Sequence, residues 1–332
     1  MPLRLAMLGM WHTHADGMVR QALAHPEEFT WVGFHDPEPA VVAAQSRRWS
    51  PLVPEYRVFD SAAELLRQPL DAVVVEGRVS GNVALARQAI ERGFPVLLEK
   101  PAGVNQGDFV ALATAASQRG LHLQMAYLFR YMSAVQELLA RAGRRELGEI
   151  YLFRGRLPKD LGLYDSLVEE LEAYRGGVFF EMAGHLVDLA VALAGPPRRV
   201  TPHLRHHHSQ GPAEFVDNGL AVLEFERALA ELDITALEVA PGQRRIEVFG
   251  TGGACVIPNL GSGHLANNAI QPLEVYRRGD AGWQTLALPA ATLQIGDLRE
   301  FASVVSGKKQ ADFSLNHDQI VHEALLRASG ML

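Results

Sequence analysis

The feature that most constrains the fold is an alternation of short apolar runs with helix-length segments over residues 1–125. The runs are rich in Val and Leu and lack the strict apolar–polar alternation of a half-buried strand. Strands buried on both faces and joined by helical crossovers form a parallel sheet. The predicted strands are Leu3–Leu8, Trp31–Phe34, Ala72–Val75, Val96–Leu98 and Leu121–Ala126, and the predicted helices are 14–25, 37–48, 61–67, 80–92 and 106–119.

The pattern changes after residue 130, where strand-like segments follow one another without intervening helices. Such a series predicts an antiparallel sheet. We therefore expect an α/β domain with a doubly wound parallel sheet over residues 1–125 and an α+β domain over residues 126–332. The second domain's strands are Gly148–Gly155, Leu220–Phe225, Leu229–Thr235, Arg245–Phe249, Ala254–Ile257 and Leu273–Arg277; its helices are 178–194, 296–305 and 315–329, and its most irregular loops are 201–214 and 258–272.

Composition excludes several classes of protein. The 332 residues exceed what one hydrophobic core usually supports. A net charge of −7 without a long basic run argues against nucleic-acid and anionic-membrane partners. No apolar stretch reaches the length of a membrane span, and the first apolar run is too short for a signal peptide, so we expect a cytoplasmic protein. The single cysteine, Cys255, excludes an internal disulfide and is expected to be a small buried hydrophobe.

A turn of the dinucleotide-binding kind follows the first predicted strand. In such folds this turn meets the pyrophosphate at a helix N-terminus, and its pattern is G-x-G-x-x-G. Here only Gly9 keeps the pattern, because Trp11 and His14 stand at the second and third glycine positions. Backbone N–H groups can still bind a phosphate, although Trp11 limits its approach. We expect Gly9, Trp11, His12 and Thr13 to contact a cofactor.

Asp36 closes the second predicted strand, about 20 residues beyond the turn. A carboxylate at this position can hold the ribose 2′-OH of NAD and repels the 2′-phosphate of NADP. The alternative interpretation is an N-cap for the next helix, with Pro37 at its first position.

His12 and His14 could be metal ligands, but residues two apart on a helix face different ways. We therefore expect no metal site. The run His206–His208 is interpreted as part of a solvated loop.

Two charged residues end the fourth predicted strand, in the sequence Glu99-Lys100-Pro101. Ligands of open α/β sheets bind beyond the carboxyl ends of the strands, so Lys100 could reach a substrate or a nicotinamide. The alternative is a surface salt bridge on an ordinary loop.

The apolar helix 178–194 carries a stripe formed by Glu181, His185 and Asp188, at spacings i, i+4 and i+7. Buried ionisable groups are costly unless paired. The stripe therefore indicates acid–base chemistry centred on His185. A structural alternative is that Asp188 only holds the imidazole of His185.

Taken in order, these motifs resemble the glucose–fructose oxidoreductase / inositol dehydrogenase (Gfo/Idh/MocA) family over essentially the whole chain. The resemblance implies a Rossmann NAD-binding domain, with NADP also possible, and a C-terminal α+β domain with a large, mostly antiparallel sheet. The motifs are Glu99-Lys100-Pro101, Arg130-Tyr131, Leu147–Ile150, Gly176-Gly177, His185–Asp188 and Gly250–Gly253, the last interpreted as a turn between strands.

The family resemblance also implies hydride transfer between a nicotinamide and a hydroxyl-bearing carbon, often of a sugar or cyclitol. By that resemblance Lys100, Glu181 and His185 are the catalytic residues, with Glu181 replacing the usual aspartate. Glu99, Lys100 and Pro101 would contact the cofactor. Partner subunits would pack on the open face of the large sheet, giving a homodimer or homotetramer.

The departures from the family pattern fall near the expected cofactor and substrate. Besides the glycine turn and Glu181, the usual Pro-x-x-x-His after the fourth family strand is missing, and Asn82 stands where histidine is usual. These departures put cofactor binding and standard catalysis in question more than the architecture.

The main functional hypothesis is a dehydrogenase of sugars, cyclitols or related polyols. His185 takes the hydroxyl proton, Lys100 stabilises the developing negative charge on the substrate oxygen, and Glu181 orients one of them. Asp188 holds His185, and Arg130 supports the substrate side. Two alternatives remain: a non-catalytic dinucleotide- or sugar-binding regulatory protein, and a lyase or glycosidase that uses NAD transiently.

Overall fold

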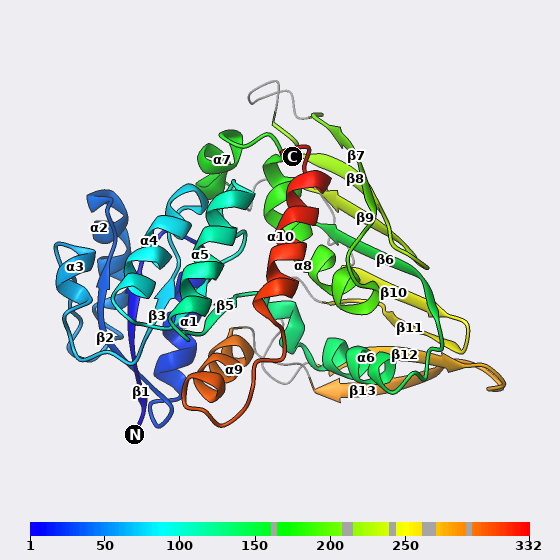
Figure 1. The fold of residues 1–332 in the computed structure, drawn as a ribbon, viewed down its shortest axis with the longest axis horizontal. Coiled ribbons are helices and arrows are strands. Elements are labelled where there is room, and N and C mark those ends of the chain that lie inside the picture. Colours follow the sequence, from blue (N-terminus) through cyan, green and yellow to red (C-terminus); the bar gives the residue numbers. More distant parts are fainter. Residues whose placement is uncertain (161–164, 208–214, 239–243, 261–269, 290–293) are drawn as a thin grey trace. The chain divides into compact units, whose positions relative to one another are not determined.

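The structure, a computed structural model, describes residues 1–160, 165–207, 215–238, 244–260, 270–289 and 294–332. The chain forms two compact units (Figure 1). The first comprises Met1–Tyr127 and Leu293–Gln319, and the second comprises Leu128–Thr292 and Ile320–Leu332.

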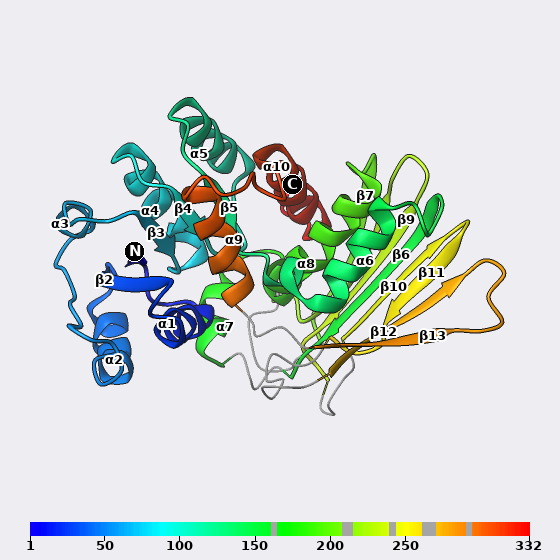
Figure 2. The same cartoon turned by 90° about the horizontal axis from the view of Figure 1, so that it is seen from below.

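The first unit is built on a five-stranded parallel sheet in the order β2-β1-β3-β4-β5. β3 and β4 are buried along their whole length, as expected for strands covered on both faces by helices (Figure 2). All five predicted strands and five predicted helices are confirmed. They are β1 (Leu3–Leu8), α1 (His14–Ala24), β2 (Phe29–His35), α2 (Pro39–Trp49), α3 (Ala62–Leu65), β3 (Ala72–Val75), α4 (Val79–Glu91), β4 (Val96–Leu98), α5 (Gln106–Gln118) and β5 (Leu123–Met125).

A late segment of the chain returns to this first unit. α9 (Ile295–Val305) places Leu298 and Phe301 in the same hydrophobic core as strand β1. Arg299 also pairs with Glu28 at 2.6 Å. The predicted boundary at residue 125 assigns this helix to the second domain, so the compact units differ from that division by residues 126–127 and 293–319. Local periodicity predicts a helix, but it does not show which hydrophobic core, distant in the sequence, the helix packs into.

The second unit contains an eight-stranded, mostly antiparallel sheet in the order β13-β12-β11-β10-β6-β9-β8-β7, with β6 and β9 as its parallel pair. The glycine-rich Gly250–Gly253 segment is a turn between β10 and β11, as predicted. The elements are η1 (Leu128–Tyr131), α6 (Ser133–Gly143), β6 (Ile150–Pro158), α7 (Asp165–Glu172), α8 (Gly177–Ala194), β7 (Arg199–Arg205), β8 (Asn218–Glu224), β9 (Leu229–Thr235), β10 (Arg245–Gly250), β11 (Gly253–Ile257), β12 (Ile270–Arg277) and β13 (Gln284–Pro289); α10 (Leu315–Ala328) closes the chain.

The strands that the sequence analysis missed, β7 and β13, are the two edges of this sheet. Edge strands tolerate proline and charged residues because one side of their backbone has no neighbour. β7 carries Pro202 between arginines, which made part of it look like a loop. The other expected loop, 258–272, lies mostly outside the described residues, as do His208 and residues 209–214.

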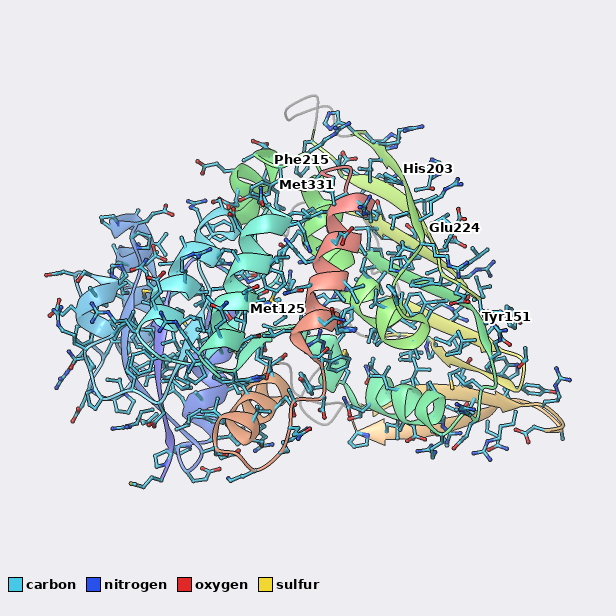
Figure 3. The ribbon with its side chains drawn as sticks, viewed as in Figure 1. Met125, Tyr151, His203, Phe215, Glu224 and Met331 are labelled. Atoms are coloured by element: carbon cyan, nitrogen blue, oxygen red, sulfur yellow. The ribbon has the colours of Figure 1, made fainter. Side chains whose placement is uncertain are left out.

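Helix α8 is the central helix of the second unit and packs against its sheet. It is also the one helix among the described residues that is long and apolar enough to cross a membrane. However, 83% of it is buried within the protein, as in the core helix of a globular domain. On the opposite face of the sheet, side chains such as Tyr151 and His203 point away from α8 (Figure 3).

The buried position of Cys255 gives a chemical test of the second unit. Its side chain is 1% exposed in β11, and burial raises the pKa of the thiol to about 11. At pH 8 about one thiol in a thousand would therefore be the reactive thiolate. We expect Ellman's reagent to label the native protein slowly and the urea-unfolded protein completely within minutes. Equal rates in both states would contradict the burial.

Candidate active site

The carboxyl ends of strands β1 to β4 carry residues that the sequence singled out, together with Glu76, which it did not. Gly9 follows β1, Asp36 follows β2, Glu76 follows β3, and Glu99 with Lys100 follows β4. Parallel strands bring such ends to one edge of the sheet. In this sheet the strand order reverses between β1 and β3, which is the place where open α/β sheets bind ligands.

Position 9 requires glycine because two backbone segments approach each other closely there. Its φ is +79°, a conformation that glycine adopts without strain. A Cβ at this position would lie 2.3 Å from the backbone nitrogen of Gly77, so no larger residue fits. The His12 backbone N–H donates to the carbonyl oxygen of Glu76 at 2.8 Å, which ties the turn after β1 to the end of β3.

The turn leads into helix α1, whose N-cap residue makes no side-chain capping hydrogen bond. That residue, Thr13, is exposed, and the first helical N–H, that of His14, donates instead to His12 Nδ1 at 3.2 Å. The N-terminus of a helix is suited to bind an anion such as a phosphate. Trp11 is half-buried beneath Arg78, whose guanidinium carbon lies 4.8 Å from the ring centroid. Arg78 in turn pairs with Glu38 at 2.5 Å.

Asp36 is held by two backbone N–H groups. Met10 donates to Oδ2 at 2.6 Å and Glu38 donates to Oδ1 at 2.8 Å. Burial raises the pKa of Asp36, and these two hydrogen bonds oppose the shift. The alternative interpretation of Asp36 as a helix N-cap is wrong, because Glu38 is the N-cap and α2 begins at Pro39.

Glu76, Glu99 and Lys100 form a buried charged group. Both glutamates are 0% exposed and Lys100 is 3% exposed, so the surface-salt-bridge alternative is wrong. Burial, with the negative charge of Glu99 nearby, raises the pKa of Glu76 well above its usual value. Burial also acts to raise the pKa of Glu99, but His14, His12 and Lys100 together bring it below its usual value. The pKa values of the two carboxyl groups are therefore shifted in opposite directions. Pro101 follows Lys100 through a cis peptide bond.

His12 and His14 lie against this group. His14 Nδ1 is 3.0 Å from Glu99 Oε1, and His12 Nδ1 is 3.6 Å from the same oxygen. The expectation that the two imidazoles point apart is wrong, because His12 lies in the turn and His14 begins α1. Their ring centroids are 4.6 Å apart, edge to face.

In the second unit, the stripe on α8 is buried as expected from the apolar helix. Glu181, His185 and Asp188 are 5%, 6% and 0% exposed. Both oxygens of Asp188 accept hydrogen bonds from the Arg130 guanidinium, at 3.0 and 2.6 Å. This bidentate pair joins α8 to η1, and it explains how a fully buried carboxylate is compensated. The role of Asp188 in holding His185 stays a prediction.

Phe129 is a site residue that the sequence analysis missed. Its ring stacks on His185 with centroids 4.3 Å apart and an angle of 14° between the planes. The stacking fixes the plane of the imidazole. Its neighbour Arg130 had been singled out, and the only sequence signal for Phe129 was that adjacency.

The structure thus forms two groups of predicted residues, one in each unit. The first gathers the Gly9 turn, His12, Asp36, Glu99 and Lys100, and the second gathers Arg130, Glu181, His185 and Asp188. Two family models cover all of these residues except Arg130. One, described as an oxidoreductase family with an NAD-binding Rossmann fold, matches residues 3–127; the other, the GFO/IDH/MocA C-terminal domain, matches residues 133–256.

The chain belongs to the Gfo/Idh/MocA family. It is therefore a member of an oxidoreductase family with an NAD-binding Rossmann domain. Among curated relatives it is 24% identical over 195 residues to an inositol 2-dehydrogenase of Gluconacetobacter diazotrophicus, covering 55% of this chain and 52% of that enzyme. The matches to four curated relatives span 52–64% of their lengths.

Solved structures share the fold over nearly the whole chain. A putative NADPH-dependent oxidoreductase from Desulfitobacterium hafniense aligns with a TM-score of 0.83 and 16% identity, covering 99% of this chain and 95% of that one. The WlbA dehydrogenase of Bordetella pertussis, solved with NADH and UDP-GlcNAcA, aligns with a TM-score of 0.74 and 17% identity, covering 99% and 97%. At these identities the likeness concerns the fold of this Gfo/Idh/MocA protein.

Replacing Gly9 tests the close approach at the turn. We expect Gly9→Ala to lower the free energy of unfolding by about 2–4 kcal/mol, from the positive φ and the clash with Gly77. The matched control is Gly81→Ala in α4, where an added Cβ meets nothing within 4 Å and should stabilise by up to about 1 kcal/mol. Urea denaturation measures both, and equal effects would contradict the account of Gly9.

The Arg130–Asp188 pair makes a second prediction. Removing either partner breaks this buried bidentate pair, so Arg130→Met and Asp188→Leu should each cost about 3–5 kcal/mol in unfolding free energy. The double variant should cost less than the sum of the two, because no charge is then left behind. As a control, Arg299→Ala breaks a solvent-exposed pair and should cost less than about 1 kcal/mol. Additive single effects would show that the two charges do not stabilise each other.

Proposed function

We propose that this protein is an NAD(P)-dependent dehydrogenase that transfers a hydride between a hydroxyl-bearing carbon of a sugar, cyclitol or related polyol and the nicotinamide. The observation that carries the proposal is Lys100, a cation 3% exposed at the carboxyl end of β4 in an NAD-binding family. A buried ammonium is costly to maintain, and a role at the ligand-binding edge of the sheet accounts for it.

The residues at this edge fit a dinucleotide. The turn at Gly9 leads to the N-terminus of α1, where Thr13 makes no side-chain capping hydrogen bond, and a helix N-terminus suits a pyrophosphate. Asp36 lies at the position that accepts a ribose hydroxyl. Asn82 is 0% exposed, and neither its Oδ1 nor its Nδ2 has a hydrogen-bond partner among the described residues. A bound ligand would satisfy such polar atoms.

Each residue has a role set by its chemistry. When bound, the nicotinamide supplies or accepts the hydride. Lys100 donates a hydrogen bond to the substrate oxygen and stabilises its negative charge. His185, held in plane by Phe129, takes the hydroxyl proton, and Glu181 orients one of these two groups. Asp36 favours NAD over NADP, because its carboxylate repels a 2′-phosphate. Inositol 2-dehydrogenase among the relatives supports a polyol substrate.

A substrate screen with matched variants tests the proposal. The purified protein is incubated with NAD⁺ or NADP⁺ and a panel of cyclitols, aldoses and nucleotide sugars, and formation of the reduced cofactor is followed by absorbance. We expect turnover that His185→Ala lowers by about 10²–10⁴ and Lys100→Ala also lowers, with NADH affinity nearly unchanged in His185→Ala. His203→Ala, at an exposed strand position, should behave as the wild type.

The other outcomes decide between the alternatives. Wild-type turnover in His185→Ala would remove His185 from the mechanism. NADH binding without turnover on any substrate would favour the regulatory binding protein. A cleaved or dehydrated product formed with catalytic NAD⁺ and no net NADH would favour the lyase or glycosidase.

A further inference from the structure

We propose that the first unit binds a divalent transition-metal ion between His12, His14 and Glu99. One ligand atom from each of the three side chains lies within 4.8 Å of the other two. His12 and Glu99 are buried, and His14 is half-buried. These side chains lie in the region that the proposed function assigns to the cofactor, but the metal proposal rests on their own geometry and is tested without a cofactor.

The local backbone brings the two imidazoles to one point. His12 lies in the turn after β1, outside the helix, whereas His14 is the first residue of α1. The backbone N–H of His14 donates to Nδ1 of His12 at 3.2 Å. Nδ1 of His12, which lies near Glu99, accepts that hydrogen bond and therefore carries no proton. A ring nitrogen without a proton is the form that binds a metal, and a metal ion would replace the backbone N–H as its partner.

The distances suit a small divalent ion. The two Nδ1 atoms, of His14 and His12, are 3.0 and 3.6 Å from Glu99 Oε1. With metal–ligand bonds of about 2.0–2.1 Å, neighbouring ligands of a tetrahedral site are about 3.4 Å apart. The two separations from Glu99 Oε1 lie on either side of this value.

A second observation is the lack of donors around the neighbouring carboxylates. Among residues 1–160 and the other described segments, no group hydrogen-bonds to either carboxylate oxygen of Glu76 or to Oε2 of Glu99. Both side chains are 0% exposed, and Glu76 Oε2 lies 3.7 Å from His12 Nδ1. Unsatisfied buried acceptors are unfavourable, and a cation among them would remove that cost. Glu76 can serve as a fourth ligand or hold His12 in place.

The ligand set selects the class of metal. Two imidazoles and one carboxylate are typical of Zn²⁺, Co²⁺ and Fe²⁺ sites, whereas Mg²⁺ and Ca²⁺ prefer oxygen ligands alone. Lys100 faces the same carboxylate, with Nζ 3.9 Å from Glu99 Oε1, and its charge opposes the ion. Removing that charge in Lys100→Met should therefore tighten binding.

The test is a metal titration in the absence of any cofactor. The background variant replaces His206, His207 and His208 by alanine, because consecutive histidines bind metal ions adventitiously. After treatment with EDTA, the protein is titrated with Zn²⁺ by calorimetry and with Co²⁺ by visible absorption. We expect one ion per chain, intense visible bands typical of tetrahedral Co²⁺, and two imidazoles per zinc by X-ray absorption.

Variants identify the ligands. His14→Ala and Glu99→Gln should each weaken binding at least about tenfold. The matched control His25→Ala, at the other end of α1 with its ring bonded to the Gln21 carbonyl, should bind as the background does. Circular dichroism and unfolding midpoints check that each variant folds. Lack of saturable binding by the background protein, or binding unaffected by His14→Ala, would overturn the proposal whether or not NADH binds.

Discussion

Two glutamates buried on neighbouring strands are the constraint on which the first unit depends. Glu76 and Glu99 end β3 and β4, and neither side chain has any exposed surface. Two carboxylates in a region of low dielectric cannot both stay charged without compensation. Lys100 supplies a positive charge 3.9 Å from Glu99, and His14 Nδ1 lies within hydrogen-bond distance of the same carboxylate.

The second unit also buries a carboxylate and compensates its charge with a residue of its own. Asp188 is fully buried on α8, and the bidentate pair with Arg130 satisfies both of its oxygens. His185 lies one turn before Asp188 on α8. Its imidazole stacks on Phe129, which fixes the plane of the imidazole ring. A rigid imidazole on a buried helix is what a proton-transfer role requires. The two groups of residues thus prepare different parts of the proposed chemistry.

The sequence predicted the features that local periodicity and strand ends determine. The five parallel strands, the long buried helix α8 and the position of Lys100 followed from the apolar pattern and the Glu-Lys-Pro turn. What failed depended on contacts distant in sequence. The return of α9 to the first unit, the edge strands β7 and β13, and the contact of Phe129 with His185 have no local signal. The prediction that His12 and His14 face different ways was wrong, because α1 begins at His14 and His12 lies before the helix.

The central proposal is that a dinucleotide binds at the carboxyl edge of the first sheet and that Asp36 makes this site prefer NAD over NADP. Calorimetric titration with NADH and then NADPH tests this most directly, once absorbance shows that no cofactor remains from purification. The account predicts saturable NADH binding at one site per chain and NADPH binding at least about tenfold weaker, since Asp36 repels the 2′-phosphate. Binding of neither nucleotide would show that Trp11 and His14 in the glycine turn have abolished the site, and the dehydrogenase proposal would then fail.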